Sequence, residues 1–200
     1  MMAFDEATLH FYASEAPVYT ASGKDGSFKH LEPFLDRLPA GASILELGCG
    51  GGYDAAFMLA RGFDVHATDG VPEMADTAEA RIGRPVAVMR FDQLDAEEQF
   101  DAVVAAAALL HVPRDSLGDV LGRVWRALKP GGWHIASFKA GGTEGRDRLG
   151  RHFNYLSPQQ AEQYYREAGD WQSLEIAASI GGGYDGAQGP WIAVTVQKHA

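Results

Sequence analysis

The sequence predicts an α/β protein with a doubly wound, mainly parallel sheet. Short apolar segments alternate with helix-forming segments along most of the chain, and no helix-forming segment separates the last two apolar ones. Strands that alternate with helices pair in parallel, and the helices cover both faces of the sheet. Two strands joined only by a loop pair antiparallel instead. We therefore expect seven strands, with the last one antiparallel.

In the first half of the chain, apolar runs bounded by turn residues indicate four strands and two helices. The stretch after the first strand has a helix-favouring composition until Gly62, a residue that suits the end of a helix. Pro72 stands just inside the start of the next helix, where its missing N–H is tolerated. In order, we expect strand 43–47, helix 53–61, strand 63–68, helix 72–82, strand 85–90 and strand 100–106.

In the second half, apolar residues between 115 and 128 recur at helical spacing. A Pro-Gly-Gly turn at 130–132 introduces the fifth strand, and Ser157 followed by Pro158 is typical of a capped helix start. In order, we expect helix 115–128, strand 133–138, helix 157–168, strand 174–180 and strand 191–197. We interpret residues 38–200 as one domain and residues 1–37 as a helical extension that serves as a lid.

Composition narrows the class of function. The chain has 200 residues, with 17 Lys and Arg against 27 Asp and Glu, and therefore a formal charge of −10. Proteins that bind nucleic acid or anionic lipid normally present a basic face, so this acidic charge argues against both as main partners. The longest apolar run is about half of the ~18 residues that span a bilayer, and no secretory signal is evident. One cysteine and seven histidines without ligand spacing predict no disulfide and no metal site. We expect a cytoplasmic protein with a small-molecule substrate and no nucleic-acid or membrane partner; the oligomeric state stays open.

The glycine-rich turn at 48–52, directly after the first strand, is the predicted centre of the chemistry. Glycines let the backbone pass close to a ligand, and free N–H groups at the following helix start favour electron-rich atoms. In parallel sheets, ligands bind beyond the carboxyl ends of the strands where the strand order reverses. The dinucleotide fingerprint G-x-G-x-x-G would need glycine at position 53, where tyrosine stands, and this departure disfavours a nicotinamide cofactor.

The segment 46–52, ELGCGGG, resembles the motif E/D-x-G-x-G-x-G of class I S-adenosylmethionine (SAM)-dependent methyltransferases, and the resemblance extends from about residue 38 to 197. It implies a Rossmann-like fold and SAM as cofactor, with S-adenosylhomocysteine (SAH) as product. In that family the acid matching Glu46 helps to hold the amino group of SAM. Asp69 matches the acid that binds the ribose hydroxyls, and Asp92 matches the acid that accepts a hydrogen bond from the adenine amine.

The resemblance implies further cofactor contacts. Phe91 or Leu94 would cover a face of the adenine ring. Related enzymes often close SAM beneath an N-terminal helix, which suggests Tyr12 and Tyr19; ordinary packing of these rings on the domain is the alternative. The expected cofactor-binding residues are Tyr12, Tyr19, Glu46, Gly48, Cys49, Gly50, Asp69, Gly70, Phe91, Asp92, Gln93, Leu94, Ala106 and Ala107.

A closer resemblance is to small bacterial methyltransferases labelled tellurite-resistance-like, over segments 100–114, 128–133 and 145–155. His111, after the fourth strand, would lie near the transferred methyl group as a catalytic base or substrate ligand, or would only fix its turn. The basic residues Lys139, Arg146, Arg148 and Arg151 lie close together in an acidic chain, which predicts an anionic substrate. We assign Arg146, Arg148 and Tyr155 to that substrate; for Arg151 we expect an ion pair with Glu144 or Asp147 on a solvated loop.

The sequence thus predicts a SAM-dependent methyltransferase that acts on a small molecule. The alternative is a SAM- or nucleotide-binding module without transferase activity, which the same acids and glycines would fit. SAM carries an electrophilic methyl group, so the enzyme must align a nucleophile and exclude water, and a base is needed only if the nucleophile arrives protonated. The glycines at 181–183, 186 and 189 have only a loop interpretation.

Overall fold

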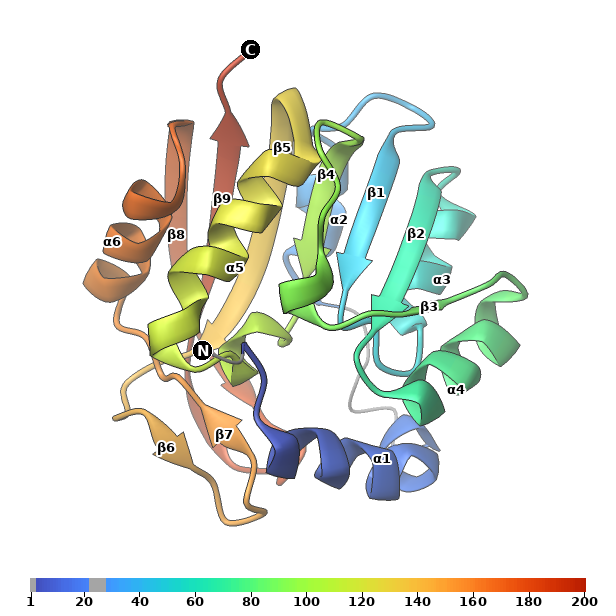
Figure 1. The fold of residues 1–200 in the computed structure, drawn as a ribbon, viewed down its shortest axis with the longest axis vertical. Coiled ribbons are helices and arrows are strands. Elements are labelled where there is room, and N and C mark those ends of the chain that lie inside the picture. The colour runs from blue at the N-terminus through green and yellow to red at the C-terminus, as the bar shows by residue number, and fades with distance from the viewer. Residues whose placement is uncertain (1–2, 22–27) are drawn as a thin grey trace.

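The computed structural model describes residues 3–21 and 28–200, and it confirms the predicted sheet. Seven strands lie in the order β3-β2-β1-β4-β5-β9-β8 (Figure 1). Strands β1 to β5 are parallel, whereas β9 runs antiparallel to both β5 and β8. The strand order reverses between β1 and β4, and a crevice is expected at that point, beyond the carboxyl ends of the two strands.

The elements agree closely with their predicted bounds in the first half of the chain and less closely in the second. The third strand has only two residues, and the last two strands are each longer than expected. A small hairpin, β6–β7, was not predicted. The strands are β1 (Ser43–Leu47), β2 (Asp64–Asp69), β3 (Ala87–Val88), β4 (Phe100–Ala105), β5 (Leu128–Lys139), β6 (Gly145–Arg146), β7 (His152–Phe153), β8 (Trp171–Gly182) and β9 (Gln188–Lys198). The α-helices are α1 (Glu6–Ala21), α2 (Leu31–Leu35), α3 (Tyr53–Ala60), α4 (Pro72–Ile82), α5 (Arg114–Ala127) and α6 (Pro158–Ala168), and the 3-10 turns are η1 (Phe91–Gln93) and η2 (Leu109–His111).

Helices cover both faces of the sheet because successive side chains of each strand point to opposite sides. On β1, Ile44 packs into a core with residues of α2, α3 and α4, whereas Leu45 packs into the core formed with α5 and α6. Fully buried strands of this kind are apolar along their whole length, which is why residues 100–105 form an almost continuous apolar run.

Helix α1 lies across the carboxyl ends of the strands and packs against α4 (Figure 1). Its first turn is tied to the β6–β7 hairpin. Arg146 donates to both carboxylate oxygens of Asp5, at 2.9 and 2.6 Å, and the backbone N–H of His152 donates to the hydroxyl of Thr8 at 2.8 Å. The N-terminal extension is therefore docked on the domain. No helix in the parts of the chain that the structure describes is long and apolar enough to cross a membrane.

A buried polar pair joins β5 to α6. His134 and Tyr165 are both fully buried, and the Nδ1–H of His134 donates to the carbonyl oxygen of Val103 at 2.9 Å. Its Nε2 therefore accepts a hydrogen bond from the Tyr165 hydroxyl, also at 2.9 Å. Burial lowers the pKa of His134 to about 4, so the ring is neutral at physiological pH.

We expect the Tyr165→Phe substitution to lower the free energy of unfolding by about 1–3 kcal/mol, because it leaves a buried nitrogen of His134 without a partner. Urea denaturation followed by circular dichroism measures the change. Tyr164→Phe is a matched control, since the neighbouring ring is only half-buried, and it should change stability by less than about 0.5 kcal/mol. Equal effects of the two substitutions would contradict the proposed importance of the pair.

Candidate functional site

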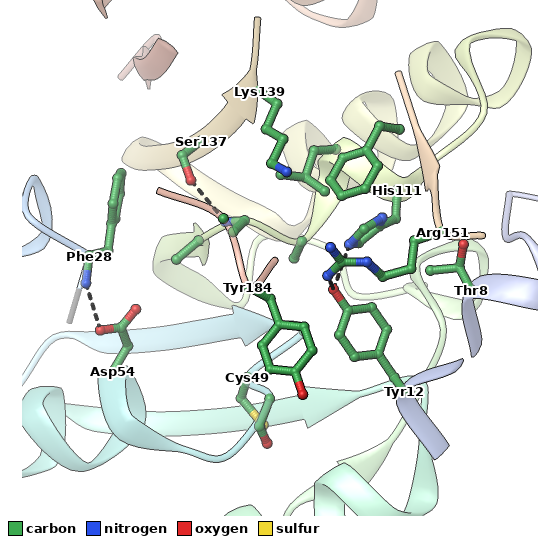
Figure 2. Close-up of a pocket in the computed structure, with 18 of the residues that line it drawn as sticks. Thr8, Tyr12, Phe28, Cys49, Asp54, His111, Ser137, Lys139, Arg151 and Tyr184 are labelled. Atoms are coloured by element: carbon green, nitrogen blue, oxygen red, sulfur yellow. Dashed lines mark hydrogen bonds between the residues drawn. The ribbon is translucent and has the colours of Figure 1, made fainter. Parts of the chain in front are cut away.

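A cavity of about 410 Å³ lies beyond the carboxyl ends of the central strands, between α1 and the β8–β9 hairpin (Figure 2). This is the position that the glycine turn and the strand order predict. The predicted cofactor residues that line it are Tyr12, Tyr19, Glu46, Gly48, Cys49, Gly50, Asp69, Gly70, Phe91, Ala106 and Ala107, and His111 lines it as well.

The structure does not bring three predicted cofactor residues, Asp92, Gln93 and Leu94, into the lining. All three belong to or follow the η1 turn, which is closed on itself: Arg90 donates to Asp92 through its Nε at 3.1 Å and to Gln93 through its backbone N–H at 2.9 Å. Leu94 is part of the core under α5. In this region Arg90 and Phe91 face the cavity instead.

The glycine turn is shaped by hydrogen bonds to the end of β2. The backbone N–H groups of Gly48 and Cys49 both donate to the carbonyl oxygen of Thr68 at 2.9 Å. The N–H of Gly50 donates to the Asp69 carboxylate, also at 2.9 Å. A Cβ atom at Gly48 would lie only 2.7 Å from the Cβ of Ala108, and its φ of +72° is one that glycine adopts without strain. The turn therefore requires glycine here to approach β4 so closely.

Three carboxylates gather at this end of the cavity: Glu46, Asp54 and Asp69. Glu46 is 2% exposed, and its Oε2 has no hydrogen-bond partner among the described residues. Burial, together with the negative charges of Asp54 and Asp69, raises the pKa of Glu46 well above its ordinary value. Burial also raises the pKa of Asp69 to about 6, although the N–H groups of Val71 and Gly50 partly oppose the shift. Buried, incompletely compensated carboxylates favour a ligand that brings positive charge or hydrogen-bond donors.

Cys49 lines the same end, but its thiol is 8% exposed. Burial raises the pKa of this thiol far above its usual range, so no thiolate forms at physiological pH. The cysteine therefore contributes shape rather than a nucleophile.

At the opposite end, His111 is held in one tautomer. Its Nδ1–H donates to the carbonyl oxygen of His152 at 2.6 Å, so its Nε2 accepts a hydrogen bond from the Tyr12 hydroxyl at 2.9 Å. Burial lowers the pKa of His111 to about 3, and the positive charge of Arg151 adds to the shift. The imidazole is therefore neutral, with its Nε2 lone pair directed at a hydroxyl on α1 (Figure 2).

Arg151 is the buried cation of the site. Its side chain is 3% exposed and donates to the Asp147 carboxylate at 2.7 and 3.0 Å. It also donates to the Tyr12 hydroxyl at 3.0 Å. The pairing with Asp147 agrees with the sequence analysis, but the pair is buried and not solvated, because aromatic rings enclose the guanidinium. The rings of Phe11, Tyr12, Phe153 and Tyr184 have their centroids 5.1–5.8 Å from it.

The residues that the sequence analysis assigned to an anionic substrate, Arg146, Arg148 and Tyr155, do not line the cavity. Arg146 is bound to Asp5, and Arg148 donates to the backbone oxygen of Asp185. The ring of Tyr155 packs beneath Gly142. The residues of the same basic cluster that line the cavity are Lys139 and Arg151. The sequence around Lys139 and Arg151 does not distinguish them from Arg146 and Arg148. The tertiary fold of this segment decides which of these four side chains point into the cavity.

Within the residues that the structure covers, 3–21 and 28–200, no group of three or more His, Cys, Asp or Glu side chains could hold a metal ion. The site consists of a glycine turn, buried carboxylates, a neutral imidazole and the cations Lys29, Arg90, Lys139 and Arg151. These groups fit an organic ligand with both polar and apolar parts.

Residues 44–132 match the family model of the methyltransferase domain. The ubiquinone biosynthesis O-methyltransferase of Xanthomonas oryzae pv. oryzae is 36% identical over 100 residues, which are 46% of this chain and 41% of that protein. The protein-L-isoaspartate O-methyltransferase of Gloeobacter violaceus is 36% identical over 85 residues, 39% of this chain and 42% of that protein. The chain thus spans about two fifths of the length of these relatives.

Solved structures of similar fold cover nearly the whole chain. The 1,6-didemethyltoxoflavin-N1-methyltransferase of Burkholderia thailandensis, with 1,6-didemethyltoxoflavin and SAH bound, has a TM-score of 0.76. Its sequence identity is 21%, and the match covers 97% of this chain and 88% of that one. The phosphoethanolamine N-methyltransferase 2 of Haemonchus contortus, in complex with SAM, has a TM-score of 0.78 and 15% identity over 98% of this chain and 60% of that one.

The fold is that of the class I SAM-dependent methyltransferases, and residues 44–132 are similar to the methyltransferase domain. SAM is the cofactor of this class. These comparisons do not extend to the narrower tellurite-resistance-like group, which stays a prediction.

We expect His111 to remain neutral, with the proton on Nδ1, from pH 8 down to about pH 5, because burial holds its pKa at about 3. Two-bond ¹⁵N–¹H correlation spectra of the histidine rings report both tautomer and charge. His111→Gln identifies the signal by removing it. A midpoint between pH 6 and 7 for this ring would contradict the buried geometry.

Proposed function

We propose that the protein transfers the methyl group of SAM to a small molecule bound in the same cavity. The observation that carries this proposal is that one cavity joins an acidic, glycine-lined end to an aromatic end that contains Lys139 and Arg151. The first end suits the cationic cofactor, and the second leaves room for an acceptor. Small-molecule acceptors also fit the solved structures of similar fold, whose names specify didemethyltoxoflavin and phosphoethanolamine.

The residues at the acidic end fit SAM chemically. The unpartnered Oε2 of Glu46 would accept a hydrogen bond from the amino group of the cofactor, and the ionised Asp69 would accept hydrogen bonds from the two ribose hydroxyls. At Gly48 the absent side chain lets the turn pack against Ala108, whereas the Cβ position of Gly50 meets only the Tyr19 ring at 4.0 Å, so a ligand can approach the main chain there. Phe91 supplies an aromatic surface for the adenine ring.

When bound, SAM supplies an electrophilic methyl group, so the chain must chiefly orient the acceptor and exclude water. Helix α1 and the β8–β9 hairpin line the cavity and would exclude water from it. His111 contributes to the orientation of the acceptor through Tyr12, because its only free lone pair, on Nε2, accepts the Tyr12 hydroxyl and so fixes that residue at the cavity. Its pKa of about 3 makes it a poor acceptor of a full proton at neutral pH. We therefore assign it a positioning role and not that of a base, and the acceptor atom would arrive with a free lone pair or a negative charge.

A SAM-binding module without transferase activity would use only the acidic end. The aromatic end with its buried cations would then have no ligand. This second compartment, and the methyltransferase relatives, favour the transferase.

We expect the protein to release labelled methyl groups from SAM to at least one compound in a screen of thiols, carboxylates, small amines and oxyanions. Asp69→Asn should bind SAH about ten- to a hundredfold more weakly, because a charge-assisted hydrogen bond contributes about 1.5–3 kcal/mol. Asp119→Asn, an exposed acid on α5, is the matched control and should bind as the unsubstituted protein does. Isothermal titration calorimetry measures these affinities. Absence of SAH binding at millimolar ligand would refute the cofactor site, and SAH binding without any transfer would favour the binding module.

The affinity for SAH should fall as the pH is lowered from 7.5 to 5. The ribose hydroxyls need the ionised form of Asp69, whose pKa is raised to about 6, so each pH unit below 6 weakens binding by up to about tenfold. Protonation of Glu46, whose pKa is also raised, acts in the same direction. Calorimetric titrations at several pH values test this, with Asp69→Asn expected to give a shallower dependence. An affinity that rises toward pH 5 would contradict the assignment of both acids.

A further inference from the structure

The ammonium group of Lys139 enters the aromatic end of the cavity without a carboxylate partner. Lys139 ends β5 and is half-buried, and within residues 3–21 and 28–200 no Asp or Glu oxygen lies within 4.0 Å of its Nζ. The nearest aromatic rings are Phe153 and Trp191, with centroids 4.4 and 5.9 Å from Nζ. Figure 2 shows the side chain reaching into the cavity from the strand that also carries Ser137.

The charged groups around Lys139 are already engaged with one another. Asp147 receives the two short hydrogen bonds from Arg151, and Asp185 lies 3.7 Å from the guanidinium of Arg148. Arg151 is therefore neutralised by its own carboxylate. Lys139, Arg148 and Arg151 together outnumber the two carboxylates by one positive charge. Burial lowers the pKa of Lys139, and the attraction of Asp185 and Asp147 only partly opposes that shift, so an incoming negative charge would be favoured there.

Ser137 adds a second donor beside the ammonium. It lies two residues before Lys139 on β5, so both side chains point to the same face of the sheet. Its hydroxyl oxygen accepts the backbone N–H of Ala107 at 2.8 Å. The hydroxyl hydrogen remains available to donate, and both residues line the cavity. An ammonium and a hydroxyl on one face form a site for an oxyanion.

The glycine-rich hairpin between β8 and β9 forms the wall of this site with backbone alone. A Cβ atom at Gly183 would lie 2.8 Å from the Nζ of Lys139, and one at Gly181 would lie 3.0 Å from the ring of Trp191. Side chains there would push the ammonium or the indole out of place. Beside these groups, the cavity is lined by the apolar residues Ile192 and Ala193. The loop interpretation of this glycine cluster is wrong for Gly181 and Gly182, which end β8, and for Gly189, which lies in β9.

We propose that Lys139 and Ser137 bind one carboxylate group of the methyl acceptor, and that the rest of the acceptor is apolar. This inference rests on the proposed function, which it narrows to the class of apolar monocarboxylates. One free positive charge matches a monoanion, whereas a phosphate dianion would require a second cation that is not already paired. The neutral imidazole of His111 agrees with an acceptor that needs no strong base.

Calorimetric titration of the SAH-saturated protein tests the proposal with phenylacetate and octanoate, each against its own amide, and with phenyl phosphate. We expect the acids to bind at least tenfold more tightly than the amides and more tightly than phenyl phosphate. Lys139→Met should reduce the affinity for the acids at least tenfold and leave the affinity for SAH within twofold. Lys139→Arg should retain most of the affinity. Arg166→Met, which removes an equal charge from the exposed face of α6, is the matched control and should change neither affinity.

Retained SAH binding shows that each variant is folded. Equal binding of acids and amides, no binding of either acid, tighter binding of phenyl phosphate, or an unchanged Lys139→Met variant would each overturn the proposal. Gly183→Ala gives an independent test, because a displaced ammonium should weaken acid binding several-fold and leave SAH binding intact. Binding of the acids that depends on Lys139, in a protein that does not bind SAH, would refute the proposed function and not the carboxylate site.

Discussion

The architecture of the site depends on the hydrogen bonds that join the glycine turn after β1 to the end of β2. Two backbone N–H groups of the turn converge on the Thr68 carbonyl, and a third donates to the Asp69 carboxylate. These bonds satisfy the donors of a turn that is buried against β4, where an unpaired N–H would be costly. They also hold Asp69 in a position where it is nearly inaccessible yet faces the cavity. The fold thus keeps Asp69 buried at the cavity although burial disfavours its ionised form.

This arrangement has an energetic consequence for the empty protein. The raised pKa values of Glu46 and Asp69 mean that their ionised forms are disfavoured by the folded state. A ligand that brings hydroxyl and ammonium donors to these oxygens recovers the lost solvation. Catalytic and binding sites commonly keep such destabilising groups where a ligand supplies the missing partner. The acidic end is therefore better explained as a prepared binding surface than as a contribution to stability.

The sequence predicted those parts of the structure that depend on local patterns. Apolar runs and turn residues located the strands, and acids at strand ends located Glu46 and Asp69, because the carboxyl ends of parallel strands share one edge of the sheet. The inward turn of Lys139 and Arg151 could not be predicted, since it depends on the small hairpin β6–β7 and on the long pairing of β8 with β9. Arg146 was misplaced for a similar reason: its partner, Asp5, lies 141 positions away in the chain.

Arg151 explains why these distant segments come together. Its guanidinium contacts Tyr12 on α1, Asp147 in the hairpin and the ring of Tyr184 in the β8–β9 loop, so three otherwise separate segments share one buried cation. Because the ion pair with Asp147 is closed to solvent, moving α1 away would expose one side of it and remove the Tyr12 hydroxyl from both Arg151 and His111. The positions of the helix, the hairpin and the imidazole are therefore linked through one set of contacts. The charge of Arg151 is neutralised within the protein by Asp147, which is why we propose Lys139, and not Arg151, as the cation that binds the acceptor.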